Sequence, residues 1–227
     1  MAQDFGPRVH IVQHPLVQDK LTHLRDVRTQ HGDFRKHMAS IAYLLFYEAA
    51  CQLPMQSLAV QTPLQVTQAP RLSTGIVLAT ILRAGLGFLE GILSACPEAR
   101  VAYLGLSRDP ESLEAYSYYQ NVPSLDASDE VFVLDPMLAT GHTAVTGLHV
   151  LHAAGARRIK LIVLVASPEG MARVHSAYPD VEIYTAAVDI GLNDKGYIYP
   201  GLGDAGDRLY GTLAHVRSGK RTEPTPL

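Results

Sequence analysis

The stretch VFVLDPMLATGHTAVTG, residues 131–147, joins an apolar run to an acid and then to a turn of small residues. The β-branched run predicts a buried strand that ends at Asp135. The Ala139-Thr140-Gly141 turn predicts the start of a helix, where free backbone N–H groups attract an anion. An acid at a strand end and a bare turn at a helix start together predict a site that holds a cation and an anion.

The regions on either side repeat this alternation of strand and helix. After the turn, a helix is predicted from Thr143 to about Ala154, closed by Gly155, and another opens near Pro168. Continuous apolar strands separated by helices are typical of a parallel sheet covered on both faces. The sequence shows no internal repeat and no linker, so an α/β fold in one domain over residues 1–227 is expected. The predicted strands are Ile76–Leu82, 101–106, 131–135, 159–166 and 181–189.

The N-terminal part of the chain, about 1–70, follows a different pattern, which predicts helices and a hairpin. Pro15 is well placed at the start of a first helix, and a second helix is expected to begin at Asp33, whose carboxylate can cap it. Prolines punctuate an alternating stretch at 54–73, which predicts a hairpin. At the other end, the polar residues from about 213 to 227 predict a mobile tail. The second helix carries an apolar face wide enough for a core or a subunit interface, which favours a homodimer or a higher homo-oligomer; this face comprises Ile41, Leu44, Leu45 and Tyr47.

Composition predicts a globular, cytoplasmic protein. The chain of 227 residues is 47% hydrophobic and 18% charged, and its net charge of -3 provides no basic field for nucleic acid. No apolar run reaches the roughly 18 residues of a membrane span, and the N-terminus lacks a signal pattern, so no membrane partner is expected. Cys51 and Cys96 predict two buried thiols in a reducing compartment rather than a disulfide. The histidines form no metal motif such as HExxH.

The predicted sheet indicates where a ligand would bind. In open parallel sheets, ligands bind beyond the carboxyl ends of the strands. This rule singles out the turn at 83–85, Arg108, residues 135–143 and the loop after Asp189. The turn at 139–143 offers N–H groups and two threonine hydroxyls, which suit a phosphate. It lacks the lysine of GxxxxGK[ST], and no GxGxxG opens a βαβ unit, so a nucleoside triphosphatase or a dinucleotide enzyme is disfavoured.

Five motifs in order along the chain carry a family resemblance. DPMLATG, directly after an apolar strand, resembles the phosphoribosyl pyrophosphate (PRPP) motif of the type I phosphoribosyltransferases. The wider set resembles the uracil phosphoribosyltransferase branch of that family, and DPMLATG together with PGLGDAGDR is highly specific. The motifs span nearly the whole chain: HPLVQDKL (14–21), FR (34–35), ILRAGLG (81–87), DPMLATG (135–141) and GYIYPGLGDAGDRLYGT (196–212).

The resemblance implies a fold and a reaction. The fold is the type I phosphoribosyltransferase fold, a mostly parallel central sheet flanked by helices, with N-terminal helices and a C-terminal base-binding loop or hood. The reaction transfers the phosphoribosyl group of PRPP to uracil, giving uridine monophosphate (UMP) and diphosphate in pyrimidine salvage. Magnesium (Mg2+) is expected to be held through PRPP, with no direct protein ligand. GTP is a candidate effector, because some members of the family are activated by it.

The resemblance also implies roles for individual residues. Arg83 and Arg108 would grip the pyrophosphate, since guanidinium forks suit phosphate oxygens. Asp135 would lie under the ribose, near the positive charge that develops there. Asp204 would lie close to PRPP, and these four residues are the catalytic candidates. PRPP is expected to bind Arg83, Arg108, Asp204 and the stretch Asp135, Pro136, Met137, Leu138, Ala139, Thr140, Gly141, His142 and Thr143; uracil is expected to bind Ile198, Gly203, Asp204 and Ala205.

Two residues depart from the pattern of most type I enzymes. Most members have a second acid where this chain has Pro136, and the uracil branch shares the proline. Only one carboxylate, that of Asp135, is then available to the ribose. His142 stands where the family usually has glycine. It either faces solvent from a helical backbone or alters the phosphate pocket, where its imidazole would titrate near neutral pH. Elsewhere, the segment 108–123 is the candidate cover of the site, and Asp189 is expected to orient the loop that follows it.

Two other functions stay open at this point. A phosphoribosyltransferase for another nucleobase would use the same chemistry, although the PGLGDAGD loop favours uracil. A non-catalytic regulator of the same fold would bind nucleotide or RNA, and a degraded PRPP site or a basic face would favour it. The chain is mildly acidic and retains Asp135, Thr140, Arg83 and Arg108, which favours the enzyme.

Overall fold

A central sheet organises the computed structural model of the chain, which describes residues 5–108 and 115–212. Its strands follow the order β1–β10–β9–β7–β4–β5–β6, and β8 pairs with β9 beyond the end of β7. Neighbouring strands run parallel except β6, which is antiparallel to β5, so the predicted mostly parallel α/β sheet is confirmed. The strands are β1 (Val9–Ile11), β4 (Ile76–Leu82), β5 (Arg100–Arg108), β6 (Ala115–Asn121), β7 (Glu130–Leu134), β8 (Met137–Leu138), β9 (Arg158–Ala166) and β10 (Glu182–Val188).

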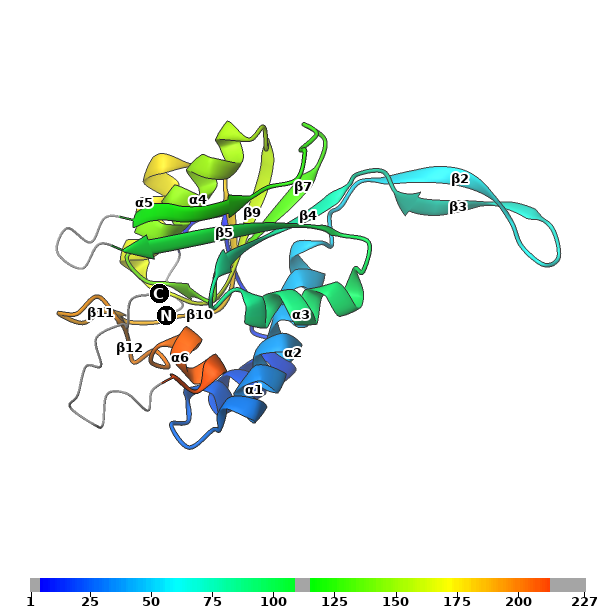
Figure 1. Cartoon of the computed structure of the whole chain (residues 1–227). Helices are drawn as coiled ribbons and strands as arrows, with labels where there is room; N and C mark the ends of the chain where they lie inside the picture. The colour runs from blue at the N-terminus through cyan, green and yellow to red at the C-terminus, as the bar shows by residue number, and fades with distance from the viewer. Residues whose placement is uncertain (1–4, 109–114, 213–227) are drawn as a thin grey trace, which may run out of the picture.

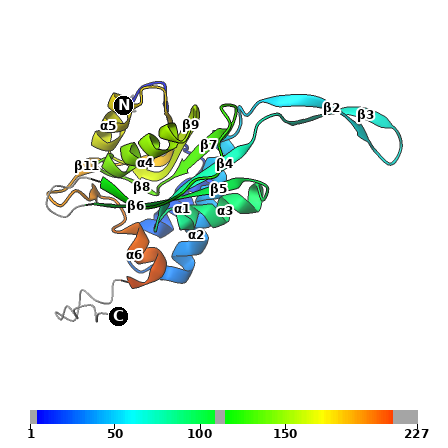
Figure 2. The same ribbon diagram turned by 45° about the horizontal axis from the view of Figure 1, so that its top comes forward.

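Helices cover both faces of this sheet (Figure 2). Successive residues of a strand point to opposite faces, so Leu78 lies in one hydrophobic core and Val77 in the other. Both side chains are fully buried, which explains why the strands read as continuous apolar runs. One core is covered by α1 (Pro15–Arg25), α2 (His31–Ala49), α3 (Leu86–Ala95) and α6 (Ala205–Tyr210); the other is covered by α4 (His142–Ala153) and α5 (Pro168–Ala177).

The first helix begins at the predicted residue, whereas the second begins two residues earlier than expected. α1 begins at Pro15, and the ring of His14 caps it by accepting a 3.2 Å hydrogen bond from the N–H of Leu16. α2 begins at His31, so the predicted start at Asp33 is wrong. Asp33 lies in the first turn of α2, where a carboxylate favours the positive end of the helix, and it accepts a 3.2 Å bond from Lys36 rather than capping.

The apolar face of α2 serves mainly the core of the chain itself. Ile41 and Leu45 are fully buried, and Leu44 packs against the same core. Tyr47 points outward and is 71% exposed. At the end of this helix Cys51 is exposed, whereas Cys96 is buried, so the expectation of two buried thiols is wrong for Cys51; both cysteines are free.

A long hairpin projects away from the body of the molecule (Figure 1). It consists of β2 (Met55–Gln61) and β3 (Val66–Leu72), which pair antiparallel along their whole length. Most of its side chains are exposed on both faces of the ribbon, including Val60, Leu64 and Val66. The tail predicted at 213–227 lies outside the described residues.

The candidate cover at 108–123 is partly a strand. β6 accounts for residues 115–121 of it, and exposed tyrosines such as Tyr116 and Tyr118 explain why no apolar run predicted a strand there. Residues 109–114 lie outside the described part of the chain, so closure of this segment stays a prediction.

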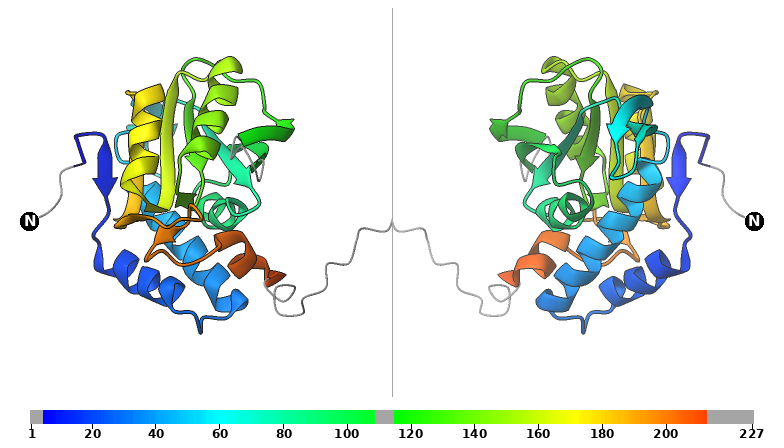
Figure 3. Two further views of the ribbon diagram at one scale, coloured as in Figure 1. Left: turned by 90° about the vertical axis from the view of Figure 1, so that its left-hand side faces the viewer. Right: turned by 90° about the vertical axis from the view of Figure 1, so that its right-hand side faces the viewer.

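A short pair of strands and a short helix lie at the carboxyl ends of the strands of the central sheet. They are β11 (Gly191–Leu192), which pairs antiparallel with β12 (Ile198–Tyr199), and α6, which Figure 3 shows beside α2. None of the described helices is long and apolar enough to cross a membrane. The end of the sheet that carries these elements is where a ligand site is expected.

Candidate active site

The predicted phosphate turn forms between β7 and α4. Pro136 leaves the line of β7, and its carbonyl oxygen accepts hydrogen bonds from the N–H groups of Leu164 at 2.9 Å and Val165 at 3.1 Å. This anchoring steers the chain into β8 beside β9. Gly141 ends the turn as the N-cap of α4 with φ +80°, a conformation that favours glycine. A Cβ atom on Gly141 would also lie 2.8 Å from the carbonyl oxygen of Gly170, so only glycine fits here without a shift.

Helix α5 supports this turn from behind. The N–H of Ser167 donates to the carbonyl of Leu138 at 2.9 Å, and the Nε of Arg173 donates to the carbonyl of Thr140 at 2.7 Å. Gly170 passes so close that a Cβ atom would collide with the carbonyl oxygen of Ala139. The carbonyl groups of Leu138, Ala139 and Thr140 are therefore bound from the α5 side.

The hydroxyl of Thr140 fits a ligand contact. It is buried, and within the described chain it has no hydrogen-bond partner. An unpaired buried hydroxyl costs free energy, which a phosphate oxygen at the turn would recover. Thr143 lies in the first turn of α4 and lines the adjacent cavity.

The Arg83 turn lies between β4 and α3. The Leu82–Arg83 peptide is cis, and the turn continues into Gly85, the N-cap of α3. A Cβ atom on Gly85 would lie 2.5 Å from both the Thr80 hydroxyl and the Leu134 carbonyl, so glycine lets the turn pack against the sheet. The side chain of Arg83 is 57% exposed and faces α6, where its Nη2 lies 3.4 Å from Asp207.

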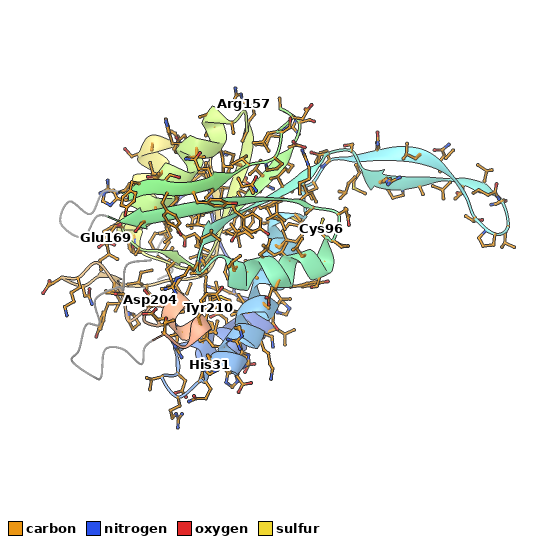
Figure 4. All side chains as sticks on the ribbon, in the orientation of Figure 1. His31, Cys96, Arg157, Glu169, Asp204 and Tyr210 are labelled. Carbon is orange, nitrogen blue, oxygen red and sulfur yellow. The ribbon has the colours of Figure 1, made fainter. Side chains whose placement is uncertain are left out.

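Helix α6 fixes the same turn from below. The hydroxyl of Tyr210 donates to the carbonyl of Arg83 at 3.3 Å. Burial raises the pKa of Tyr210, which keeps this hydroxyl protonated and able to donate. Asp204 caps α6 by accepting a 2.8 Å bond from the N–H of Asp207. Figure 4 labels Asp204 and Tyr210 on this helix, beneath the sheet.

One cavity of about 380 Å³ gathers most of the predicted site. Of the predicted residues, those that line it are Arg83, Asp135, Met137, Ala139, Thr143, Ile198, Gly203, Asp204 and Ala205. Pro136 and Leu138 do not line it, because they belong to the packed β7–β8 connection, and Thr140 and Gly141 are also absent from its lining. Arg108 is the last residue of β5, and its side chain lies outside the described part of the structure.

The cavity also contains Lys195, a residue that the sequence did not single out. Lys195 and Tyr197 line it from the connection between β11 and β12. The side-chain oxygen of Asn193 accepts bonds of 3.0 Å from the N–H groups of both residues, which shapes this connection. Lys195 adds a cation to the cavity, but a lysine in a polar loop carries no pattern that predicts such a role.

His142 lines a different cavity. It shares that space with Val145, Glu169 and Arg173 on the α5 side of the turn. The imidazole is half-buried at the first position of α4, so it neither faces solvent freely nor lines the cavity that holds Asp135.

These features combine the groups needed to bind an anionic sugar phosphate. The cavity lies at the turn that opens α4, and it is lined by a half-buried carboxylate at Asp135 and by the cations Arg83 and Lys195. The loop after Ile198 brings Gly203 to the cavity lining with positive φ, a backbone that can approach a flat ligand closely. Such a site can bind an anion at one end and a planar base at the other.

Comparison with known proteins gives one consistent result. The sequence model of the family "Uracil phosphoribosyltransferase" matches residues 11–212. The uracil phosphoribosyltransferase of Staphylococcus aureus strain Newman is 46% identical over 206 residues, which cover 90% of this chain and 99% of that protein, and the protein of strain JH1 matches equally. The solved structure of the AQ2163 protein from Aquifex aeolicus is similar with a TM-score of 0.86 and 39% identity, over 89% of this chain and 97% of that one.

Proposed function

The chain belongs to the uracil phosphoribosyltransferase family, and from this premise we propose how its cavity performs the family's reaction. The reaction transfers the phosphoribosyl group of PRPP to uracil, which forms UMP and diphosphate in pyrimidine salvage. One observation carries the site assignment: residues of three family motifs far apart in the chain line one cavity. They come from the Arg83 turn, from the stretch 135–143 (Asp135, Met137, Ala139 and Thr143) and from the loop at 196–206.

The 5′-phosphate of PRPP binds the turn at 139–143. This assignment is supported by the N–H groups at the start of α4 and by the unpartnered hydroxyl of Thr140. Thr143 supplies a second hydroxyl from the cavity side. The carbonyl groups of Ala139 and Thr140 are already bound by Ser167 and Arg173, so these two acceptors do not face the phosphate unpaired.

The catalytic groups act where charge develops during the reaction. Breaking the anomeric C–O bond creates positive character on the ribose and extra negative charge on the departing pyrophosphate. Asp135 would stabilise the positive character on the ribose, and the arginines at 83 and 108 would stabilise the negative charge on the pyrophosphate. Lys195 lines the same cavity and would add to the positive potential around the pyrophosphate. Because the protein does little covalent work, alignment of base and sugar supplies much of the rate.

Uracil binds the loop that follows β12. Ile198 is buried beneath the loop, and Gly203, Asp204 and Ala205 line the cavity next to it. Backbone groups of this loop would read the edge of the base, which glycines allow by letting the chain approach a flat ring. Asp204 also caps α6, so one residue links the loop to the helix that contacts Arg83.

Magnesium fits this cavity as a partner of the substrate. The described residues hold no group of three or more His, Cys, Asp or Glu side chains that could bind an ion. Asp135 lines the cavity, and Mg2+ is commonly held by one or two carboxylates together with substrate phosphates and water. When bound, the ion would act as a Lewis acid and neutralise charge on the pyrophosphate.

One assay tests the reaction and the alternatives together. The protein is incubated with PRPP, Mg2+ and each nucleobase in turn, and pyrophosphate release is measured. We expect turnover with uracil. Turnover with guanine or hypoxanthine but not uracil would support a different base, and a folded protein without turnover on any base would support a regulator.

The projecting hairpin supports a homo-oligomer. A two-stranded hairpin is marginally stable in water when nothing covers it, and Val60, Leu64 and Val66 are exposed on this one. A second copy of the chain is the cover that we propose. Analytical ultracentrifugation should show a dimer or larger assembly that Val66→Lys weakens. Val27→Lys changes a valine that is 90% exposed outside the hairpin and should leave assembly unchanged; a monomeric wild type would refute the proposal.

Two further properties, an effector and a location, are also proposed. GTP as an effector is tested by repeating the uracil assay at low PRPP with and without GTP. A cytoplasmic location is supported by the two free cysteines, one of them exposed, which suit a reducing compartment.

A further inference from the structure

An ion pair joins the end of helix α1 to the loop after strand β10. The guanidinium of Arg25 donates to the two carboxylate oxygens of Asp189, at 2.6 Å and 2.8 Å. The Asp189 side chain is 6% exposed and that of Arg25 is 27% exposed, so the pair is largely shielded from water. The N–H of Asp189 is bound to the Ala166 carbonyl at 2.9 Å, which fixes the acid to the sheet. A two-point arginine–carboxylate contact of this kind holds its partners in one geometry.

The same pair holds both backbone polar groups of Gly201. The N–H of Gly201 donates to Asp189 at 2.8 Å, and its carbonyl accepts from Arg25 at 2.8 Å. Gly201 has φ +58°, and a Cβ atom there would collide with the carbonyl of Ile198. The backbone therefore folds tightly onto the start of the loop at the point where the pair grips it.

A second arginine ties the next residue of the loop to the same helix end. Arg208 donates to the carbonyls of Leu24, of Asp26 at 2.6 Å and of Leu202 at 3.0 Å. Its guanidinium lies 4.4 Å from the ring centroid of Phe34, which is fully buried. The end of α1 is thus the common anchor of two successive residues of the loop.

We propose that Arg25 and Asp189 are positioning residues for uracil, because they fix the loop that reads the base. The inference rests on the proposed assignment of Ile198, Gly203 and Ala205 to the uracil slot. Neither member of the pair lines the reaction cavity, so both act through the backbone of Gly201.

The pair should affect the two substrates differently. Backbone groups that read a flat base must keep their positions closely, and a displacement of about 1 Å can cost about two orders of magnitude in rate. The phosphate turn is held instead by α5, through Ser167 and Arg173. Loosening the pair therefore weakens uracil binding and leaves PRPP binding nearly intact.

Steady-state kinetics of Arg25→Met provide the test. Methionine keeps much of the side-chain length but removes the guanidinium group. We expect the KM for uracil to rise by about tenfold or more, while the KM for PRPP changes by less than about threefold. Arg25→Lys keeps the charge but loses the two-point guanidinium contact, so its KM for uracil should lie between those of wild type and Arg25→Met. Arg8→Met is the matched control, because Arg8 also binds one carboxylate and one backbone carbonyl, both on Asp180, away from the cavity lining; both KM values should stay at the wild-type level.

Comparing the KM for uracil with the KM for PRPP distinguishes a positioning role from a loss of stability. A loss of folded protein lowers kcat without changing either KM. The double variant that combines Asp189→Asn with Arg25→Met should raise the KM for uracil no more than Arg25→Met alone, since the two residues act as one unit. Additive effects, equal rises in both KM values, or an unchanged uracil KM in Arg25→Met would overturn the inference.

Ile198→Ala distinguishes a failure of the pair from a failure of the slot. If it raises the uracil KM while Arg25→Met does not, the slot stands and the positioning role is refuted. If Ile198→Ala leaves the uracil KM unchanged, the slot assignment fails and the inference fails with it.

Discussion

The hydroxyl of Ser167 donates a hydrogen bond of 2.6 Å to the carbonyl oxygen of Ala139. The same hydroxyl accepts a 2.9 Å bond from the N–H of Gly170, so it caps α5 while it holds the phosphate turn. Ser167 is fully buried. The turn and the start of α5 are therefore one hydrogen-bonded unit, and the stability of one depends on the other.

Ser167→Ala should damage both parts of this unit. It leaves a buried carbonyl and a buried N–H without this partner, which typically costs about 1–3 kcal/mol of the free energy of unfolding. Because the turn loses a support, the KM for PRPP should rise as well. Urea unfolding and PRPP kinetics measure the two effects. Ser40→Ala is the control, since Ser40 bonds a backbone carbonyl on the exposed side of α2, and it should change stability by less than about 0.5 kcal/mol.

Thr140→Val should separate binding from stability. The Thr140 hydroxyl has no partner within the described chain, so its removal should not lower the free energy of unfolding. A hydrogen bond to a charged phosphate contributes about 1.5–3 kcal/mol, so the KM for PRPP should rise by about tenfold or more. Thr146→Val is the control, because Thr146 bonds the His142 carbonyl within α4. An unchanged PRPP KM in Thr140→Val would remove this hydroxyl from the phosphate site.

Local patterns predicted those parts of the site that lie within one segment of the chain. Asp135 and its turn follow an apolar run because β7 is buried on both faces, and such strands carry no alternation that could hide them. The start of α2 was misplaced for an equally local reason. Its N-cap, Gln30, makes no side-chain capping bond, so nothing in the sequence marks that residue, whereas Asp33 resembles a cap.

Contacts between distant segments could not be predicted in the same way. Asp189 was expected to orient its loop, but its partner Arg25 lies 164 residues earlier and shares no pattern with it. The bond between Ser167 and Ala139 arises only because β8 and β9 lie side by side. Lys195 reaches the cavity from a polar loop whose path depends on the fold. These contacts are tertiary, and a single sequence contains no periodicity that reports them.

Asp204→Asn should reduce activity without reducing stability. Asparagine caps a helix about as well as aspartate, so the bond to the Asp207 N–H is retained and the free energy of unfolding should change by less than about 0.5 kcal/mol. The lost charge should lower kcat/KM by about tenfold or more, equivalent to about 1.4 kcal/mol of transition-state stabilisation. Asp204→Ala removes the cap as well and should also cost about 1 kcal/mol of stability. Full activity in Asp204→Asn would contradict the role assigned to this loop.

The stability of the protein should fall with acid partly through His37. Burial lowers the pKa of His37, and the nearby His23 and Lys20 lower it further; the rings of His23 and His37 stack at 4.6 Å. A histidine with a lowered pKa binds fewer protons in the folded state, so its contribution is present above the ordinary pKa of about 6.5 and is lost as the pH falls below it. The free energy of unfolding in urea, measured relative to its value at pH 8, should therefore fall more steeply below that pH in the wild type than in His37→Gln. Equal slopes would contradict this source of acid sensitivity.

His142→Gly should change the affinity for PRPP by less than about tenfold, or about 1.4 kcal/mol. His142 lines the cavity beside Glu169 and Arg173, on the side of the turn away from Asp135, so its ring does not line the proposed PRPP site. A glycine at this position and the histidine found here then differ in what they present to α5 rather than to the phosphate. Isothermal titration with PRPP at pH 6 and pH 8 measures the effect, and Thr140→Val serves as the variant that should lose affinity. A loss greater than tenfold, or a pH dependence that disappears in His142→Gly, would instead make the imidazole part of the phosphate pocket.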